Sequence, residues 1–225
     1  MTNGPTVATG QKMVPPRFLF RLAAPRPHKK DMGKKQGVTL GDEYLLPLWC
    51  ELDGAAGFAQ VKAAWNEQGL ALSVRVKGKQ KPTWCRESRL ADSDGLNLWI
   101  DTRPAGNVHR ASRFCHHLVF LPTGSTVSPN FPVVGQLLIN RAKEQAEPIT
   151  PEKIHTFSQL QADGYLLEVF LEAGTLTGFN PRESPQIGFT YLVQDAELGL
   201  QTFSIGKELP FREDPSVWAV LDLVP

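Results

Sequence analysis

Cysteine is scarce in this sequence: Cys50, Cys85 and Cys115 are the three cysteines among 225 residues, and they stand far apart. The absence of any CxxC pair argues against a zinc knuckle and against a thioredoxin-type redox site. An odd number of widely spaced cysteines also argues against a disulfide framework. We therefore expect all three cysteines to be reduced and structural, which favours a cytoplasmic location.

The sequence also lacks a charge imbalance and a long apolar run. Its 24 basic and 23 acidic residues give a net charge of +1, which provides no electrostatic basis for nucleic-acid binding. No run approaches the roughly 18 apolar residues of a membrane helix. Residues 1–16 lack the apolar stretch of a signal peptide and are expected to form a mobile tail. We expect no nucleic-acid partner and no membrane partner.

Catalytic motifs are absent as well. The sequence contains no GxSxG, Walker, HExxH or GxGxxG pattern. Glu168 and Glu172 share one face of a predicted strand, but they stand too far apart for a working carboxylate pair. Glu168 is better interpreted as part of an exposed strand face or as the acceptor of a structural hydrogen bond. We expect a protein that is not an enzyme.

What the sequence has is a series of short segments that alternate apolar and polar residues, separated by Gly, Pro and Asn turns. This period of two is typical of half-buried strands, and no sustained helical period competes with it. About nine or ten strands are expected, with minor helical turns. The sequence therefore predicts an all-β fold, a single antiparallel β-sandwich (jelly-roll-like), as one domain over residues 17–225. The predicted strands lie within residues 17–23, 58–66, 69–79, 94–103, 113–124, 135–144, 153–161, 164–176, 187–197 and 216–224.

One strand candidate, "SDGLNLWIDTR" at residues 93–103, has an unusual second face. Aliphatic residues alternate along it with Asn97, Trp99 and Asp101. The aliphatic positions account for the core side of the strand, so the indole on the other side lies either under a second layer or beneath a ligand. We expect the face of Asn97, Trp99 and Asp101 to be a binding surface.

The next strand candidate adds basic groups to that face. In "HRASRFCHHLVF", His117 lies on the non-core side, and Arg110 and Arg113 lead into the strand. The short connection makes the two strands neighbours, so their non-core faces coincide. Such a mixture of indole, amide, carboxylate, imidazole and guanidinium groups suits a sugar, whose C–H face stacks on an aromatic ring and whose hydroxyls pair with planar polar groups. The basic groups favour acidic sugars over neutral ones.

Two other uses of these residues stay open. Trp99 can be a core residue, with the polar groups capping the sandwich. A metal ion is the other possibility, since Asp101, Cys115, His116 and His117 are all potential ligands. Adjacent residues of a strand point to opposite faces, so His116 and His117 cannot easily hold one ion.

The order of several motifs resembles the family 9 carbohydrate-binding modules and their close relatives. These motifs are "AAWNEQGLALSVRVKGK", "SDGLNLWIDTR", "GYLLEVFLEAGTLTGF", "IGFTYLVQDAELGLQ" and "DPSVWAVLDL", and they span about residues 40–225. The resemblance implies an antiparallel β-sandwich that binds glycans without catalysis. It implies no cofactor, although several members carry structural calcium and relatives in the wider superfamily bind haem.

The resemblance also assigns positions. An acidic ligand residue of the family falls on Asn97, and a basic one falls on or near His117. The family's two stacking tryptophans have no aligned counterpart, and Trp84 and Phe211 are the aromatic residues nearest to their positions. Asp195 matches a residue that is expected to organise a turn by accepting backbone N–H bonds.

We therefore expect non-catalytic binding of a polysaccharide or oligosaccharide, with a preference for acidic or polar saccharides. The alternatives are a haem- or metal-binding domain on the same scaffold and an enzyme that acts on glycans. The expected ligand-binding residues are Asn97, Trp99, Asp101, His117, Arg110, Arg113 and Trp84.

Overall fold

A computed structural model describes residues 23–32, 37–49, 51, 57–124, 131–204, 206 and 209–225. The expected tail over residues 1–16, most of the strand expected over 17–23, and Cys50 lie outside these residues. No helix within them is long and apolar enough to cross a membrane.

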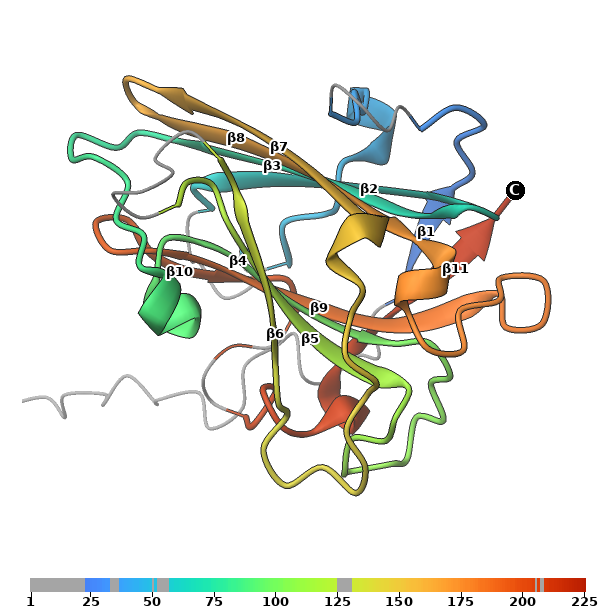
Figure 1. Cartoon of the computed structure of the whole chain (residues 1–225). Helices are drawn as coiled ribbons and strands as arrows, with labels where there is room; N and C mark the ends of the chain where they lie inside the picture. The colour runs from blue at the N-terminus through green and yellow to red at the C-terminus, as the bar shows by residue number, and fades with distance from the viewer. Residues whose placement is uncertain are drawn as a thin grey trace, which may run out of the picture.

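The described residues form two β-sheets that pack face to face (Figure 1). The larger sheet has the strand order β1-β11-β9-β4-β5-β6, and β10 also pairs with β9. The smaller sheet has the order β2-β3-β8-β7. The strands of the larger sheet are β1 (Ala23–Pro27), β4 (Gly95–Asp101), β5 (Cys115–Leu121), β6 (Val133–Leu137), β9 (Gln186–Asp195), β10 (Gly199–Thr202) and β11 (Ala219–Val224). Those of the smaller sheet are β2 (Ala59–Asn66), β3 (Gly69–Lys77), β7 (Ile154–Gln161) and β8 (Gly164–Glu172).

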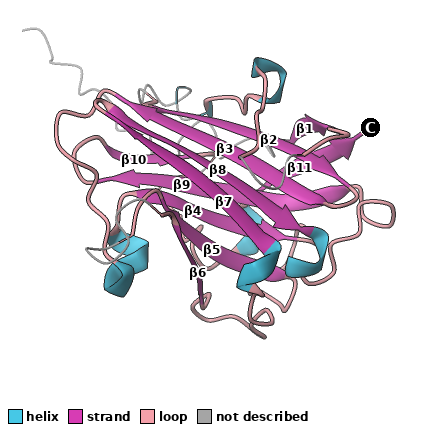
Figure 2. Cartoon of the chain, turned by 45° about the horizontal axis from the view of Figure 1, so that its top comes forward, coloured by secondary structure: helices cyan, strands magenta, loops and turns pink. Residues whose placement is uncertain are grey.

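Short 3-10 helices occur only in the connections between the described strands (cyan in Figure 2). One of them follows β8 directly and is of the kind of minor helical turn that the sequence predicts. The 3-10 helices are η2 (Asp42–Tyr44), η4 (Glu87–Asp92), η5 (Pro151–Lys153), η6 (Ala173–Thr175) and η7 (Pro215–Val217).

The main core lies between the two sheets, as the alternating sequence pattern predicts. Every second residue of β3 and β4 points into it, and these side chains have 0% of their surface exposed; they are Leu70, Leu72, Val74, Val76, Leu96, Leu98 and Ile100. Burying apolar side chains from both sheets in this way removes each strand's hydrophobic face from water. The prediction of an all-β sandwich is confirmed.

The structure adds two details to the predicted sheet arrangement. β1 pairs with β11 in parallel, so the sandwich is not wholly antiparallel, although every other pairing between described strands is antiparallel. β10 was not expected, because Gly199–Thr202 is too short for a clear alternation.

A second layer covers part of the outer face of each sheet. Over the larger sheet lies the Trp99 cluster, and over the smaller sheet lies the Phe170 cluster. The Trp99 cluster consists of Trp99, Ala111, Cys115, Ile139, Leu192, Phe211 and Trp218. The Phe170 cluster consists of Met32, Val38, Leu40, Tyr44, Ala64, Ala71 and Phe170. These covers decide which parts of the two outer faces remain open to ligands.

Candidate functional site

The two strands expected to share a polar face are neighbours. β4 and β5 pair in antiparallel fashion, with Trp99 opposite His117 and Asp101 opposite Cys115. Asn97 and His117 are joined by a hydrogen bond of 3.1 Å between the amide Oδ1 and the ring Nε2. The prediction that these two strands are neighbours is confirmed.

The face is nevertheless covered. Trp99 has 0% of its surface exposed, and its indole stacks on the His117 ring and meets Phe211 edge-on at a centroid distance of 5.4 Å. Trp218 joins the cover by donating from its indole Nε1 to the backbone oxygen of Phe211 at 2.6 Å. The face of Asn97, Trp99 and Asp101 is not open in this structure, because the chain around Phe211 and Trp218 packs over it. The expectation that it binds a ligand stays a prediction.

Burial changes the electrostatics of this face. Burial lowers the pKa of His117 to about 3, with a smaller contribution from the Arg212 charge, so the ring is neutral at neutral pH. Burial also raises the pKa of Asp101. The backbone N–H of Arg103, which donates to Asp101 Oδ1 at 2.9 Å, opposes this rise only in part. Asp101 thus holds the turn after β4.

Several polar atoms in this part of the fold are buried without a partner. Within the described residues, Asn97 Nδ2, Trp99 Nε1 and Thr190 Oγ1 have no hydrogen bond. Thr190 lies opposite Trp99 on β9, and Asn97 is two residues along the same face of β4. Burying a polar atom without a hydrogen bond is unfavourable, so three such atoms on one covered sheet face are unusual.

The remaining predicted ligand residues make local contacts. Arg110 donates to the backbone oxygens of Arg141 and Ala142, at 2.9 and 3.3 Å. The guanidinium of Arg113 lies 5.1 Å from the centre of the Phe114 ring.

Trp84 lies in the connection between β3 and β4, with the guanidinium groups of Arg86 and Arg89 over its ring at 5.5 and 5.9 Å. Trp84 and Arg113 are therefore engaged by residues of their own loops, and Arg110 is engaged by the separate loop of Arg141 and Ala142. None of the three lines an open site with the others.

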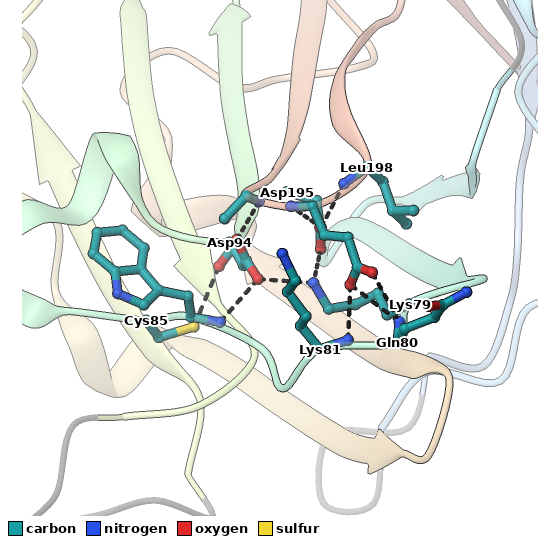
Figure 3. Close-up of polar contacts among 10 residues, drawn as sticks. Lys79, Gln80, Lys81, Cys85, Asp94, Asp195 and Leu198 are labelled. Atoms are coloured by element: carbon teal, nitrogen blue, oxygen red, sulfur yellow. Dashed lines mark hydrogen bonds and ion pairs between the residues drawn. The ribbon is translucent and has the colours of Figure 1, made fainter.

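A buried ion pair holds one end of the sandwich together (Figure 3). The Lys79 ammonium lies 3.1 Å from Asp94 and 2.5 Å from Asp195. Asp94 also accepts hydrogen bonds from the backbone N–H groups of Trp84 and Ala196, at 2.8 and 2.7 Å. All three charged side chains are at most 2% exposed.

Asp195 organises the turn after β9, which confirms its predicted role. Its Oδ1 accepts from the backbone N–H groups of Glu197 and Leu198, at 2.9 and 3.0 Å. Burial raises its pKa, but the hydrogen bonds from Lys79 and the two backbone amides outweigh this, so the pKa is lowered overall. Burial likewise lowers the pKa of Lys79, and its bonds to Asp195 and Asp94 raise it overall.

This network does not fit a structural calcium ion. Calcium takes six to eight oxygen ligands, whereas here the Lys79 ammonium already lies between the two carboxylates. No group of three or more His, Cys, Asp and Glu side chains in the described part of the chain could hold a metal ion. His116 and His117 point to opposite faces of β5, since His116 Nε2 accepts from the Thr177 amide at 3.0 Å.

One Ser–His–Asp contact occurs near η7, but its geometry is not that of a catalytic triad. The Oδ2 of Asp214 and the Oγ of Ser216 both lie 3.0 Å from the same nitrogen, Nδ1 of His109. In a triad the serine contacts the opposite ring nitrogen from the aspartate, so that a proton can pass through the imidazole. Asp214 instead accepts from the Ser216 amide and caps η7.

An open polar pocket of about 500 Å³ lies on the outer face of the smaller sheet, beside the Phe170 cluster. Its floor follows the strand pairing: Lys62, Ser73, Glu168 and Phe157 form one cross-strand row, and Gln60, Arg75 and Leu166 form the next. The remaining lining residues are Thr39, Leu40, Asp42 and Lys77. We refer to it as the sheet pocket.

Some groups in the sheet pocket are engaged and others are not. Lys62 Nζ donates to Leu40 O at 2.9 Å and to Asp42 at 2.8 Å. Glu168 accepts from the Val38 amide at 3.0 Å, which confirms the structural hydrogen bond considered for it. The side chains of Arg75 and Lys77 have no hydrogen-bond or ion-pair partner among the described residues.

Comparison with known proteins identifies the fold. No family model matches the chain, and no curated protein matches it in sequence. Two solved structures match it over 90% of its length. A family 9 carbohydrate-binding module from Caldicellulosiruptor kristjanssonii in complex with cellotriose is 15% identical, with a TM-score of 0.59 and 94% of that chain covered. The structure in complex with glucose is 13% identical, with a TM-score of 0.54 and 95% covered. The chain has the fold of a family 9 carbohydrate-binding module.

Within this family 9 fold, sequence reasoning missed the sheet pocket. Lys62, Arg75 and Glu168 alternate with core residues, and that pattern is typical of any solvent-exposed strand face. The one available signal was that strong cations and an acid face the same side of predicted neighbouring strands. The pocket wall formed by Thr39–Asp42 packs against the sheet from a distant part of the sequence.

Proposed function

We propose that this chain is a non-catalytic carbohydrate-binding protein. The observation that carries the proposal is the sheet pocket, an open polar cavity on a family 9 fold whose volume lies in the range of small-molecule sites. Its lining combines an aromatic ring, amide and hydroxyl groups, and charged groups, which are the partners that sugar rings and hydroxyls use. The two solved structures that share this fold are complexes of a carbohydrate-binding module with cellotriose and with glucose.

The ligands are polar or acidic saccharides. Lys62, Arg75 and Lys77 bring three positive charges to the sheet pocket, against the carboxylates of Asp42 and Glu168. Lys62 and Asp42 pair with each other, and the Glu168 carboxylate offsets one of the two remaining cations, so the pocket keeps a net positive charge. Complementary charge favours an anionic ligand and speeds its association.

Binding at the face of Asn97, Trp99 and Asp101 would require the Phe211–Trp218 cover to move. The paired donors and acceptors there, Asn97 and His117, are 2% and 8% exposed. A saccharide would have to replace the contacts of Phe211 with Trp99 before it could stack on the indole. The sheet pocket needs no such rearrangement.

A glycan array that contains neutral, uronic-acid and sulfated oligosaccharides tests the proposal, followed by calorimetric titration of each hit. We expect saturable binding to a subset of polar or acidic oligosaccharides. Chromatography of the bound oligosaccharide after long incubation should recover it intact, as a non-catalytic role requires. A wild-type protein that binds nothing on the array would refute carbohydrate binding, and new cleavage products would refute the non-catalytic role.

A further inference from the structure

We propose that the sheet pocket binds a uronate-containing saccharide, with the sugar carboxylate on Arg75 and the sugar ring against Phe157. This inference rests on the proposed function and adds the location and the chemistry of recognition. It places the ligand on the smaller sheet, opposite to the face of the larger sheet that the sequence favours.

Arg75 lies at the centre of the pocket floor. It is half-buried on β3, directly opposite Gln60 of β2 on one side and Leu166 of β8 on the other. The Glu168 carboxylate on the same face accepts from the Val38 amide, and the charge of Arg75 acts on it through space. A half-buried guanidinium with no partner among the described residues presents a planar set of donors, and a carboxylate matches that set with two parallel hydrogen bonds.

Other arginines in the described part of the chain show the contrast. Arg26 donates to two backbone oxygens, Arg103 pairs with Glu183, and Arg110 bonds to backbone oxygens of its neighbouring loop. Arg75 has no comparable contact while it lines a cavity. The guanidinium donors of Arg75 have no hydrogen-bond acceptor among the described residues, and a carboxylate ligand would supply one.

Phe157 provides the apolar wall. It lies on β7 opposite Glu168, and 37% of its surface is exposed. An exposed aromatic ring beside polar groups suits the C–H face of a pyranose. Leu166, half-buried in the floor, extends the same apolar strip.

The uncharged polar residues of the sheet pocket would form hydrogen bonds with the sugar hydroxyls. Gln60 and Ser73 lie beside Arg75 and Lys62 on the paired strands, and Thr39 lies on the opposite wall. Amide and hydroxyl groups can both donate and accept, as sugar hydroxyls require. Lys77 lies two residues beyond Arg75 on the same face of β3 and adds positive charge at the rim.

The test uses calorimetric titration of the full chain with trigalacturonate, its methyl ester and cellotriose. The methyl ester keeps the sugar rings and removes the negative charge. The difference in affinity between the two ligands therefore measures the contribution of the carboxylate charge. We expect wild type to prefer trigalacturonate over its ester. Arg75→Gln should weaken trigalacturonate binding by about tenfold to a hundredfold, the value of hydrogen bonds to a charged group, and should erase the preference over the ester.

Two further variants separate the contributions. Arg75→Lys keeps the charge without the planar fork and should recover only part of the affinity. Phe157→Ala should weaken binding of all three saccharides alike, because it removes the stacking wall. Arg182→Gln, an exposed arginine outside the pocket, is the matched control and should bind as wild type does.

Each other outcome overturns the inference in a distinguishable way. If wild type binds saccharides but Arg75→Gln leaves every affinity unchanged, the sheet pocket is not the site and carbohydrate binding survives. If His117→Gln abolishes binding and Arg75→Gln does not, the site is the covered face of the larger sheet. If wild type binds no saccharide on the array or in titration, the proposed function itself fails. Thermal melting of each variant establishes that it is folded before it is titrated.

Discussion

The indole of Trp99 lies flat on the imidazole of His117, with the ring centroids 4.1 Å apart and the ring planes inclined by 16°. Both rings are buried beneath Phe211 and Trp218 in a second, smaller core. On an open sheet, this pair of rings would form a surface for stacking. Here it packs against Phe211 and Trp218 and holds the covering segment on the sheet.

Trp99→Ala should destabilise the protein strongly. Removing a fully buried indole leaves a cavity under the Phe211–Trp218 cover, and such changes cost about 3–5 kcal/mol of unfolding free energy. Urea unfolding measures the effect, and Trp84→Ala, at a half-buried loop position, should cost clearly less. A Trp99→Ala protein as stable as wild type would contradict the buried role and would favour an open platform again.

The protein should lose stability as the pH falls below about 6.5. Burial lowers the pKa of His116 from 6.5 to about 4 and that of His117 to about 3, so the unfolded chain binds more protons than the folded chain between these values. Each histidine then reduces the unfolding free energy by up to about 1.4 kcal/mol per pH unit across its window. His117→Gln should flatten the slope of unfolding free energy against pH; an unchanged slope would show that His117 does not titrate in this way.

Lys79→Met should be among the most destabilising single changes. It leaves the Asp94 and Asp195 carboxylates buried without a counter-charge, and breaking a buried pair in this way costs about 3–5 kcal/mol. The loss should shrink at low pH, where protonation removes the uncompensated charge. The control is Lys81→Met, at an exposed position two residues along, which should melt close to wild type. Equal melting temperatures for the two variants would contradict a stabilising role for the pair.

Gly37→Ala, beside the wall of the sheet pocket, should lower the free energy of unfolding by more than the backbone strain of an alanine at positive φ accounts for. Gly37 has φ of +87°, and a Cβ there would collide with Glu168 Oε2. Gly78 has φ of +92° with open space around it, so Gly78→Ala measures the backbone cost alone. That cost is about 1 kcal/mol, and Gly37→Ala should exceed it in urea unfolding. Equal costs would indicate that Glu168 moves aside freely.

Cys85 and Cys115 should be reduced and slow to react. Burial raises the pKa of both thiols to about 12, and the thiolate is the reactive form. Native protein at neutral pH should therefore leave both unlabelled by maleimide, whereas unfolded protein should be labelled. Intact mass should be the same with and without reductant, and a Cys85–Cys115 disulfide in fresh protein would refute the prediction.

The alternation of residues was enough to predict the sandwich and the pairing of β4 with β5, because strand periodicity and a short connection act locally. It could not predict what lies on the outer faces. The cover over Trp99 comes from Phe211 and Trp218, more than 100 residues further along the chain. The wall of the sheet pocket comes from Thr39–Asp42 and meets Arg75 only in the folded state. Whether an outward side chain meets water, a second layer or a cavity depends on such distant contacts.

The parallel pairing of β1 with β11 has a consequence for synthesis of the chain. Ala23 lies opposite Val220, and β11 stands between β1 and β9 in the sheet. During translation, β1 emerges long before the strand that joins it to the larger sheet. Until β11 leaves the ribosome, this edge of the sheet is incomplete, and pairing across so long a separation slows folding. Completion of this sheet edge therefore depends on residues near 220, and a ribosome stalled before them would hold a nascent chain with one sheet edge unpaired.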